Sequence, residues 1–294
     1  MLRKLADNVL MMGNQHFNYV VVGQEEAVLI ECGVSAGVMS FRQDWQQLSN
    51  PPKIKKIVAM HEHFDHVCGI PGLREMLPGV PVLAHPRAGR VLAKSSVVKD
   101  FFRQDDEMSD LFTRRRIIKE KPPALGIDSI AIDEYISEGD TVPIDIFSGL
   151  RVMETPGHSP SSLALYLKAE QMMCLSDAGG YQIRSDFIFP IFFQGYESYL
   201  ESIERMSTIP TRILALPHGQ IWTGVSVHLF YRRAREEAEK AFKSIRRRLE
   251  EGMEGDEIEK ALYQHYYRDD LTIYTPDNIR LCVKLLVQRV KECL

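Results

Sequence analysis

The stretch His61-Glu62-His63-Phe64-Asp65-His66 decides the expected fold of this chain. It directly follows an apolar run at residues 54–60, which predicts a buried strand ending in a loop. Imidazole nitrogens and carboxylate oxygens are ligands of zinc, iron and manganese. Alternating histidines in an extended loop can direct His61 and His63 to one ion, while Asp65 and His66 reach its neighbour. The motif therefore predicts half of a two-metal site.

The composition is that of a globular protein, with 45% hydrophobic and 26% charged residues among 294. There is no apolar run long enough to span a bilayer, and the first residues lack the features of a secretory signal, so we expect no membrane partner and a cytoplasmic location. Five scattered cysteines indicate reduced thiols. A net charge of −4 gives no general attraction to nucleic acid, despite arginine clusters at 114–116 and 246–248.

Apolar periodicity divides the chain into two groups of strands and a helical end. Strands are predicted at 8–12, 17–22, 27–31, 54–60, 81–84, 134–137, 150–154, 162–167, 172–176 and 212–216, and helices at 40–48, 69–77 and 197–206. Residues 87–126 are charged with helical periodicity and predict a helical insertion. Three helices are predicted from residue 226 onward. We expect a catalytic domain at 1–224 and a C-terminal helical cap at 225–294.

Three further candidate ligands, His158, Asp177 and His218, each follow an apolar strand. Their order after the first motif resembles the metallo-β-lactamase superfamily. That resemblance implies an α+β fold, an αββα sandwich whose loops gather ligands along one edge, here with a helical insertion and a C-terminal α-helical extension. Position by position it implies one metal held by His61, His63 and His158, a second held by Asp65, His66 and His218, and Asp177 as the bridging carboxylate.

The third predicted strand departs from the pattern of this superfamily. Such families often have aspartate where that strand ends, whereas this chain has Glu31-Cys32-Gly33. We therefore expect the groups that support the ligands there to be arranged differently. Glutamate in place of His63 would indicate the diiron flavoprotein branch, and cysteine in place of Asp177 the antibiotic-hydrolysing branch. Neither substitution is present.

A second resemblance extends over almost the whole length. Met1-Leu2-Arg3, Val82-Leu83-Ala84 before the insertion, the segment 199–205 and the three-helix ending resemble the thioesterases of alkylquinolone signal biosynthesis. Those enzymes (2-aminobenzoylacetyl-CoA thioesterase-like) remove coenzyme A from an aromatic β-ketoacyl thioester. The resemblance implies a small-molecule acyl substrate and a thioester bond.

The expected cofactors are two divalent metal ions, zinc or iron and otherwise manganese. Two cations that share a water lower its pKa, which supplies a hydroxide to attack a carbonyl or phosphoryl centre. Asp65 is the candidate catalytic residue, because a partly free carboxylate can orient the nucleophile or shuttle its proton. A thiolate leaves readily, so the absence of an obvious general acid fits a thioester.

Aromatic residues begin four positions after Asp177 and are the candidates for substrate binding. They either wall an apolar pocket or fill the core between sandwich and helices. The residues concerned are Tyr181, Phe187, Phe189, Phe192 and Phe193. Tyr181 is also a candidate for touching the reacting carbonyl. We expect packing or surface roles for His16, His85, His228, His265 and Cys68.

Several alternatives stay open at this stage. The same hydroxide would serve a lactonase or a phosphodiesterase. In another class, the fold would act as a signalling or partner-binding protein with secondary hydrolase activity. Its C-terminal helices would then form a homodimer or bind a regulatory protein.

Overall fold

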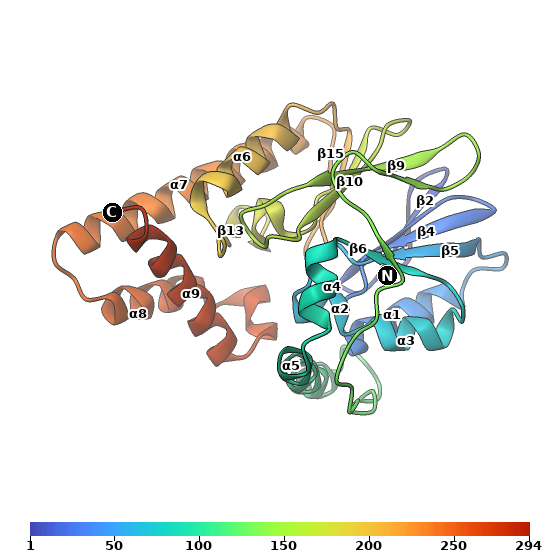
Figure 1. Ribbon diagram of the computed structural model, residues 1–294, viewed down its shortest axis with the longest axis horizontal. Helices are drawn as coiled ribbons and strands as arrows, with labels where there is room; N and C mark the ends of the chain where they lie inside the picture. The colour runs from blue at the N-terminus through green and yellow to red at the C-terminus, as the bar shows by residue number, and fades with distance from the viewer.

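The computed structural model describes residues 1–294 and has two β-sheets that pack face to face (Figure 1). The first sheet has the order β1-β2-β3-β4-β5-β6-β7, antiparallel from β1 to β4 and parallel from β4 to β7. Its strands are β1 (Arg3–Ala6), β2 (Val9–Gly13), β3 (Asn18–Val22), β4 (Glu26–Ile30), β5 (Lys53–Val58), β6 (Val82–Ala84) and β7 (Glu134–Tyr135). It is the sheet predicted from the N-terminal apolar segments, with β1 in addition.

The second sheet has the order β15-β14-β11-β10-β9-β8. Its strands are β8 (Thr141–Pro143), β9 (Gly149–Glu154), β10 (Leu163–Leu167), β11 (Met172–Cys174), β14 (Ile213–Ala215) and β15 (Trp222–Thr223). β11 and β14 run parallel, whereas the other pairs are antiparallel. The parallel pair requires a crossover, and α6 (Tyr196–Ser207) lies within that connection.

Each sheet buries both of its faces, as β4 shows. Val28 and Ile30 belong to a cluster of 20 buried residues between the two sheets. Ala27 and Leu29 point the other way, into the larger cluster that the helices cover. Because side chains alternate along a strand, a continuous apolar run is needed when both faces are covered. The result is the αββα arrangement expected from the sequence.

Helices on the two outer faces complete the layers. On the outer face of the first sheet lie α1 (Ser35–Trp45) and α3 (Ile70–Met76), with the short α2 (Phe64–Val67) and α4 (Pro86–Leu92) beside them. The longer α5 (Ser95–Arg114) packs on α1, α2 and α4. The region 87–126 thus contains most of α4 and all of α5. α1 begins earlier than the predicted residue 40. The prediction missed this start because the N-cap residue, Val34, has no side chain that can cap a helix.

The C-terminal third is helical and returns to the sandwich. α7 (Ser226–Glu250) runs alongside α6 and extends beyond the sheets, and α8 (Gly255–Tyr266) and α9 (Pro276–Lys291) fold back along it (Figure 1). A 3₁₀ helix, η2 (Asp269–Ile273), joins α8 to α9 and contacts the hairpin of β12 (Tyr181–Arg184) and β13 (Phe187–Phe189). No helix is long and apolar enough to span a lipid bilayer.

Candidate metal centre

All seven predicted ligands lie together at one edge of the sandwich, just beyond the ends of strands. The loop after β5 carries His61 and His63 and continues into α2 with Asp65 and His66. His158 follows β9, Asp177 lies in the 3₁₀ helix η1 (Ser176–Gly179) after β11, and His218 follows β14. Six of the seven are buried and His63 is half-buried. The structure therefore brings together every member of the set.

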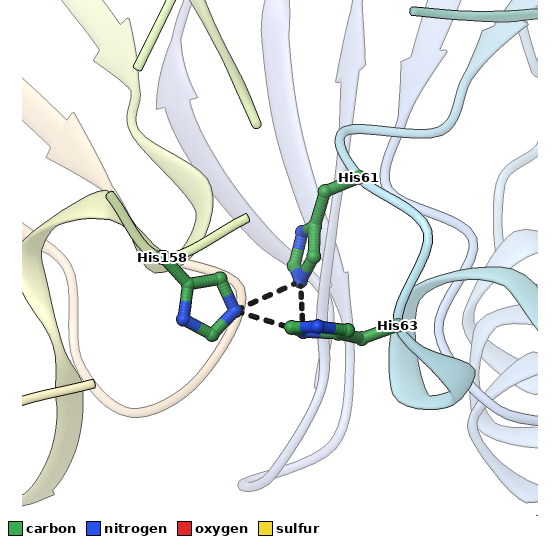
Figure 2. A group of neighbouring side chains, drawn as sticks. All are labelled: His61, His63 and His158. Atoms are coloured by element: carbon green, nitrogen blue, oxygen red, sulfur yellow. Dashed lines mark hydrogen bonds between the residues drawn. The ribbon is translucent and has the colours of Figure 1, made fainter. Parts of the chain in front are cut away.

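The first group consists of three imidazoles whose nitrogens converge on one point. His158 Nε2 lies 2.9 Å from His63 Nδ1 and 3.2 Å from His61 Nε2, and the last two nitrogens are 3.1 Å apart (Figure 2). Tetrahedral zinc at about 2.0–2.1 Å from each nitrogen separates its ligands by roughly 3.3 Å. The observed spacing fits such a group, and the three residues satisfy the geometric criterion for holding an ion.

The second group contains Asp65, His66 and His218. His66 Nε2 lies 3.3 Å from His218 Nε2, and Asp65 Oδ2 is 3.7 Å and 3.6 Å from those two nitrogens. Asp177 lies between the groups: its Oδ2 is 3.4 Å from Nε2 of both His158 and His66. Asp177 can therefore contribute an oxygen to either group, which is the position of a bridging carboxylate.

Two of the imidazoles are oriented by backbone carbonyls. Nδ1 of His158 donates to the oxygen of Ile191 at 2.9 Å, and Nδ1 of His218 donates to the oxygen of His16 at 2.8 Å. A carbonyl can only accept, so in both rings Nδ1 carries the hydrogen. The Nε2 lone pair is then free to face the centre, as a metal ligand requires.

Glu31 supports one imidazole in each group. Its Oε2 lies 2.8 Å from Nδ1 of His66, and its Oε1 accepts from Oγ of Ser176 at 2.9 Å. The same Oγ lies 3.3 Å from Nδ1 of His61. Glu31 and Ser176 both adopt left-handed backbone conformations, with φ of 74° and 53°, which costs free energy in residues other than glycine. Glu31, where the sequence departs from the pattern of the superfamily, is therefore the residue that orients His66.

The charges of the centre favour a cation. Burial opposes ionisation of Asp177, but the neighbouring imidazoles outweigh it and lower its pKa to about 2. Burial, reinforced by His63, lowers the pKa of His158 to about 4, so this ring is neutral at pH 7. The only ion-pair partners of Glu31, Asp65 and Asp177 are histidines, with no lysine or arginine among them. Three buried carboxylates among ligand-type nitrogens thus fit divalent ions.

Glu62 has a role that the sequence did not reveal. Its buried Oε2 accepts hydrogen bonds from Oγ of Ser159, at 2.7 Å, and from Oγ of Ser161. These serines closely follow His158. The carboxylate therefore ties the loop of His61 and His63 to the loop of His158, and it does so without contacting the ligand nitrogens.

Two tyrosines at the centre bond to carboxylates. The hydroxyl of Tyr274 donates to Asp65 Oδ2 at 2.6 Å, and that of Tyr181 donates to Asp270 Oδ2 at 2.9 Å. Burial and the nearby carboxylates raise the pKa of both tyrosines well above the usual value of 10. Both hydroxyls therefore stay protonated at neutral pH. Tyr274 and Asp270 come from the C-terminal third, where no motif in the sequence indicates a site.

A mostly apolar cavity of about 180 Å³ opens beside the ligands. His63, Asp65, His158 and Asp177 lie in its wall, and most of the remaining lining comes from the C-terminal helices and the segment after Asp177. Of the candidate substrate-binding residues, the lining includes Tyr181, Phe189 and Phe193. Phe187 and Phe192 lie outside it: Phe187 stacks on Tyr266, and Phe192 is fully buried against Tyr196 and Tyr199. For these two, packing is the observed role.

The other histidines and Cys68 lie outside the metal-type groups. His16 packs on Phe112 with Nδ1 2.7 Å from Asp270 Oδ1, and His85 caps α4 by accepting from the backbone nitrogen of Arg87. His265 packs against Phe187, and His228 lies on α7. Cys68 is a buried free thiol.

Comparison with known proteins agrees with this fold. The model of the metallo-β-lactamase superfamily matches residues 11–218, a range that contains all seven candidate ligands. A β-lactamase domain protein from Burkholderia ambifaria aligns over 98% of this chain and 87% of its own, with 18% identity and a TM-score of 0.63. A metallo-β-lactamase family protein from Thermus thermophilus aligns over 95% and 93%, with 16% identity and a TM-score of 0.61.

An archaeal superfamily protein from Sulfolobus tokodaii aligns over 80% of this chain and 86% of its own, with 18% identity and a TM-score of 0.58. At such identities the likeness to solved structures shows a shared fold and leaves the substrate open. The family model covers well over half of the sequence. The chain therefore belongs to the metallo-β-lactamase superfamily.

Proposed function

We propose that this protein is a dinuclear metal-dependent hydrolase that cleaves an acyl thioester. The observation that carries the proposal is the convergence of five imidazoles and two carboxylates on two adjoining points. One ion would be held by His61, His63 and His158 and the other by Asp65, His66 and His218, with Asp177 between them. Zinc and iron both suit this donor set, and manganese is a further candidate.

Bound divalent ions would supply a hydroxide at neutral pH and polarise the carbonyl of the substrate. The chain's own contribution is orientation and exclusion of water. Asp65 lies in the cavity wall with Oδ2 engaged by Tyr274, so its other oxygen is available to orient the nucleophile or to take its proton. The apolar lining keeps the reacting carbonyl in a poorly solvated environment, which strengthens electrostatic interactions.

The lining of the cavity favours a leaving group that needs no proton. The hydroxyls in the lining are those of Tyr181 and Tyr274, and both already donate to carboxylates. Asn278 is similarly engaged, donating to Gln104 at 2.8 Å. A thiol with a pKa near 8.5 leaves as a thiolate far more easily than an alcohol leaves as an alkoxide. No lysine or arginine lines the cavity, which disfavours a phosphodiester.

The size of the cavity supports a compact acyl group. An apolar cavity of roughly 150 Å³ holds one benzene molecule. The cavity of about 180 Å³ therefore has room for a single ring with a short substituent, provided the coenzyme A portion stays outside. The resemblance to thioesterases that act on an aromatic β-ketoacyl group agrees with such a substrate.

The test combines metal analysis with a substrate panel. Purified full-length protein is analysed for zinc, iron and manganese, and is then assayed with benzoyl-type acyl-CoA, long-chain acyl-CoA, lactones and bis(p-nitrophenyl) phosphate. We expect two metal equivalents and the highest kcat/KM on the aromatic thioester. A metal-loaded protein that hydrolyses lactones but no thioester would reject the substrate class. A protein that binds no divalent metal would reject the whole proposal.

A further inference from the structure

Residues 268–278, which comprise most of the link between α8 and α9 and the start of α9, form a return segment that contacts the metal-type centre. Polar contacts fasten it to elements distant in sequence: Asp270 accepts from Tyr181, Thr272 accepts from Arg115, and Asn278 donates to Gln104. Leu271 and Ile273 of this segment are buried, and Leu271 also lines the cavity. The segment is therefore docked on the sandwich and the insertion at several points.

Tyr274 is the residue of this segment that reaches the centre. Its ring packs edge-on against Phe64 and Tyr181, with centroids 6.1 Å and 5.5 Å apart, and is buried. This packing leaves the hydroxyl aimed at Asp65 Oδ2, the oxygen that faces His66 and His218. The hydroxyl is the one hydrogen-bond donor to the Asp65 carboxylate other than the clustered imidazoles.

The other supporting groups belong to the sandwich. His66 is oriented by Glu31 at the end of β4, and His218 by the carbonyl of His16 in the loop between β2 and β3. Asp65 alone takes its orienting hydrogen bond from the C-terminal third, 209 residues away in sequence. A partner of this kind changes metal affinity by about 10- to 100-fold when it is removed.

We infer that Tyr274 is a positioning residue for the group of Asp65, His66 and His218, and that metal occupancy of this group and docking of the return segment are thermodynamically coupled. The inference rests on the proposed function. A docked segment holds Asp65 in the orientation that binds the ion. Linkage is reciprocal, so an ion that fixes Asp65 stabilises the docked segment by the same factor.

The experiment is a zinc titration of metal-free full-length protein in competition with a chromophoric chelator. Tyr274→Phe keeps the ring and removes the hydroxyl. Tyr166→Phe is the matched control, because its hydroxyl donates to the carbonyl of Pro210, away from the centre. We expect Tyr274→Phe to weaken one of the two zinc equivalents by about 10- to 100-fold and leave the other unchanged. Tyr166→Phe should match the unaltered protein.

Hydrogen exchange of the amides in residues 268–278 provides the reciprocal readout, which requires no catalytic activity. Zinc should slow exchange there in the unaltered protein. In Tyr274→Phe, a zinc concentration that fills only the unaffected site should leave exchange in this segment as fast as in the metal-free protein. Arg115→Ala loosens the segment at Thr272 without touching Asp65, so it should weaken the same zinc equivalent as Tyr274→Phe does, by a smaller factor. It tests the coupling should Tyr274→Phe fail to fold.

The outcomes separate this inference from the proposed function. If the unaltered protein binds two zinc ions and Tyr274→Phe binds both equally tightly, the inference fails while the dinuclear hydrolase stands. If Tyr274→Phe weakens both equivalents alike, the tyrosine has a general structural role and the positioning role is rejected. If the unaltered protein binds no zinc, iron or manganese, both proposals fall.

Discussion

Asp105 on α5 and Asp177 in the metal-type centre are both buried carboxylates, yet their pKa values move in opposite directions. Asp105 accepts a hydrogen bond from the backbone nitrogen of Ser35 at 2.8 Å, and burial raises its pKa to about 6. Asp177 lies among four imidazoles, which overcome the effect of burial and lower its pKa to about 2. Burial alone shifts a carboxylate toward its neutral form, whereas the imidazoles of the centre favour the charged form.

The difference shows what each region is built for. Where α5 packs against the start of α1, the carboxylate of Asp105 serves as a hydrogen-bond acceptor, and burial makes its negative charge unfavourable. At the sandwich edge, several carboxylates stay ionised beside nitrogens that are most useful when deprotonated. The attraction of these carboxylates raises the pKa of His66 and of His218, which favours protons on those rings that bound divalent cations would displace. Variants in both regions test this contrast.

Replacing Asp177 should have the largest effect. Asp177→Ala removes the oxygen donors between the two groups, so we expect loss of at least one metal equivalent and a fall in kcat/KM of at least about 100-fold, beyond the range for supporting residues. Metal analysis and thioester assays measure both quantities. Asp186→Ala is the control, since that carboxylate is exposed in the turn between β12 and β13. Full metal content in Asp177→Ala would contradict the bridging role.

Glu31 should come next, because it orients one imidazole of each group. Glu31→Gln keeps the size of the side chain but removes the charge that faces His66 Nδ1, and we expect metal affinity to fall by about 10- to 100-fold. Chelator competition measures the change. The exposed Glu26→Gln is the matched control on the strand that leads to Glu31. A loss confined to one metal equivalent would show that the contact through Ser176 to His61 contributes little.

The ligand set was predictable from sequence because each ligand follows a strand. Strand ends meet at one edge of a sheet, so His158, Asp177 and His218 could be placed near the first motif without coordinates. The layered fold was predictable for a related reason, since long apolar runs require cover on both faces. Glu31 was noticed only as a departure from a pattern, and its partners Ser176 and His66 required the structure.

The groups that hold the ligands could not be read from the sequence. Glu62 lies inside the motif but looks like a spacer, because its partners Ser159 and Ser161 lie on another loop. Tyr274 follows a short 3₁₀ helix, η2, and meets Asp65 only because η2 packs against β12 and α5. Similarly, the pocket-lining aromatic rings could not be told from the packed ones, since the β12–β13 hairpin and the turn after it decide which rings face the cavity.

Breaking the link between the two ligand loops should have an intermediate effect. Glu62→Ala removes the carboxylate that accepts from the hydroxyls of Ser159 and Ser161, so only one of them can still donate, to the other, at a cost of about 1–3 kcal/mol in the free energy of unfolding. Urea denaturation of metal-free protein measures this cost apart from metal binding. Glu62→Gln retains an oxygen acceptor and should lose less. Equal losses in the two variants would mean that the carboxylate charge matters more than the hydrogen bonds.

The last effect, at Asp105, should be a gain in stability and not a loss. Its pKa is about 6 in the folded protein and near 3.8 in the unfolded chain, so the folded form binds the extra proton and stability falls as pH rises from about 4 to 6. Asp105→Asn keeps the acceptor for Ser35 and cannot ionise. We expect it to match the unaltered protein at pH 4 and to be about 1–3 kcal/mol more stable at pH 7, by urea denaturation at both values. Equal stability at pH 7 would show that Asp105 is already balanced by a charge, and the contrast with Asp177 would then weaken.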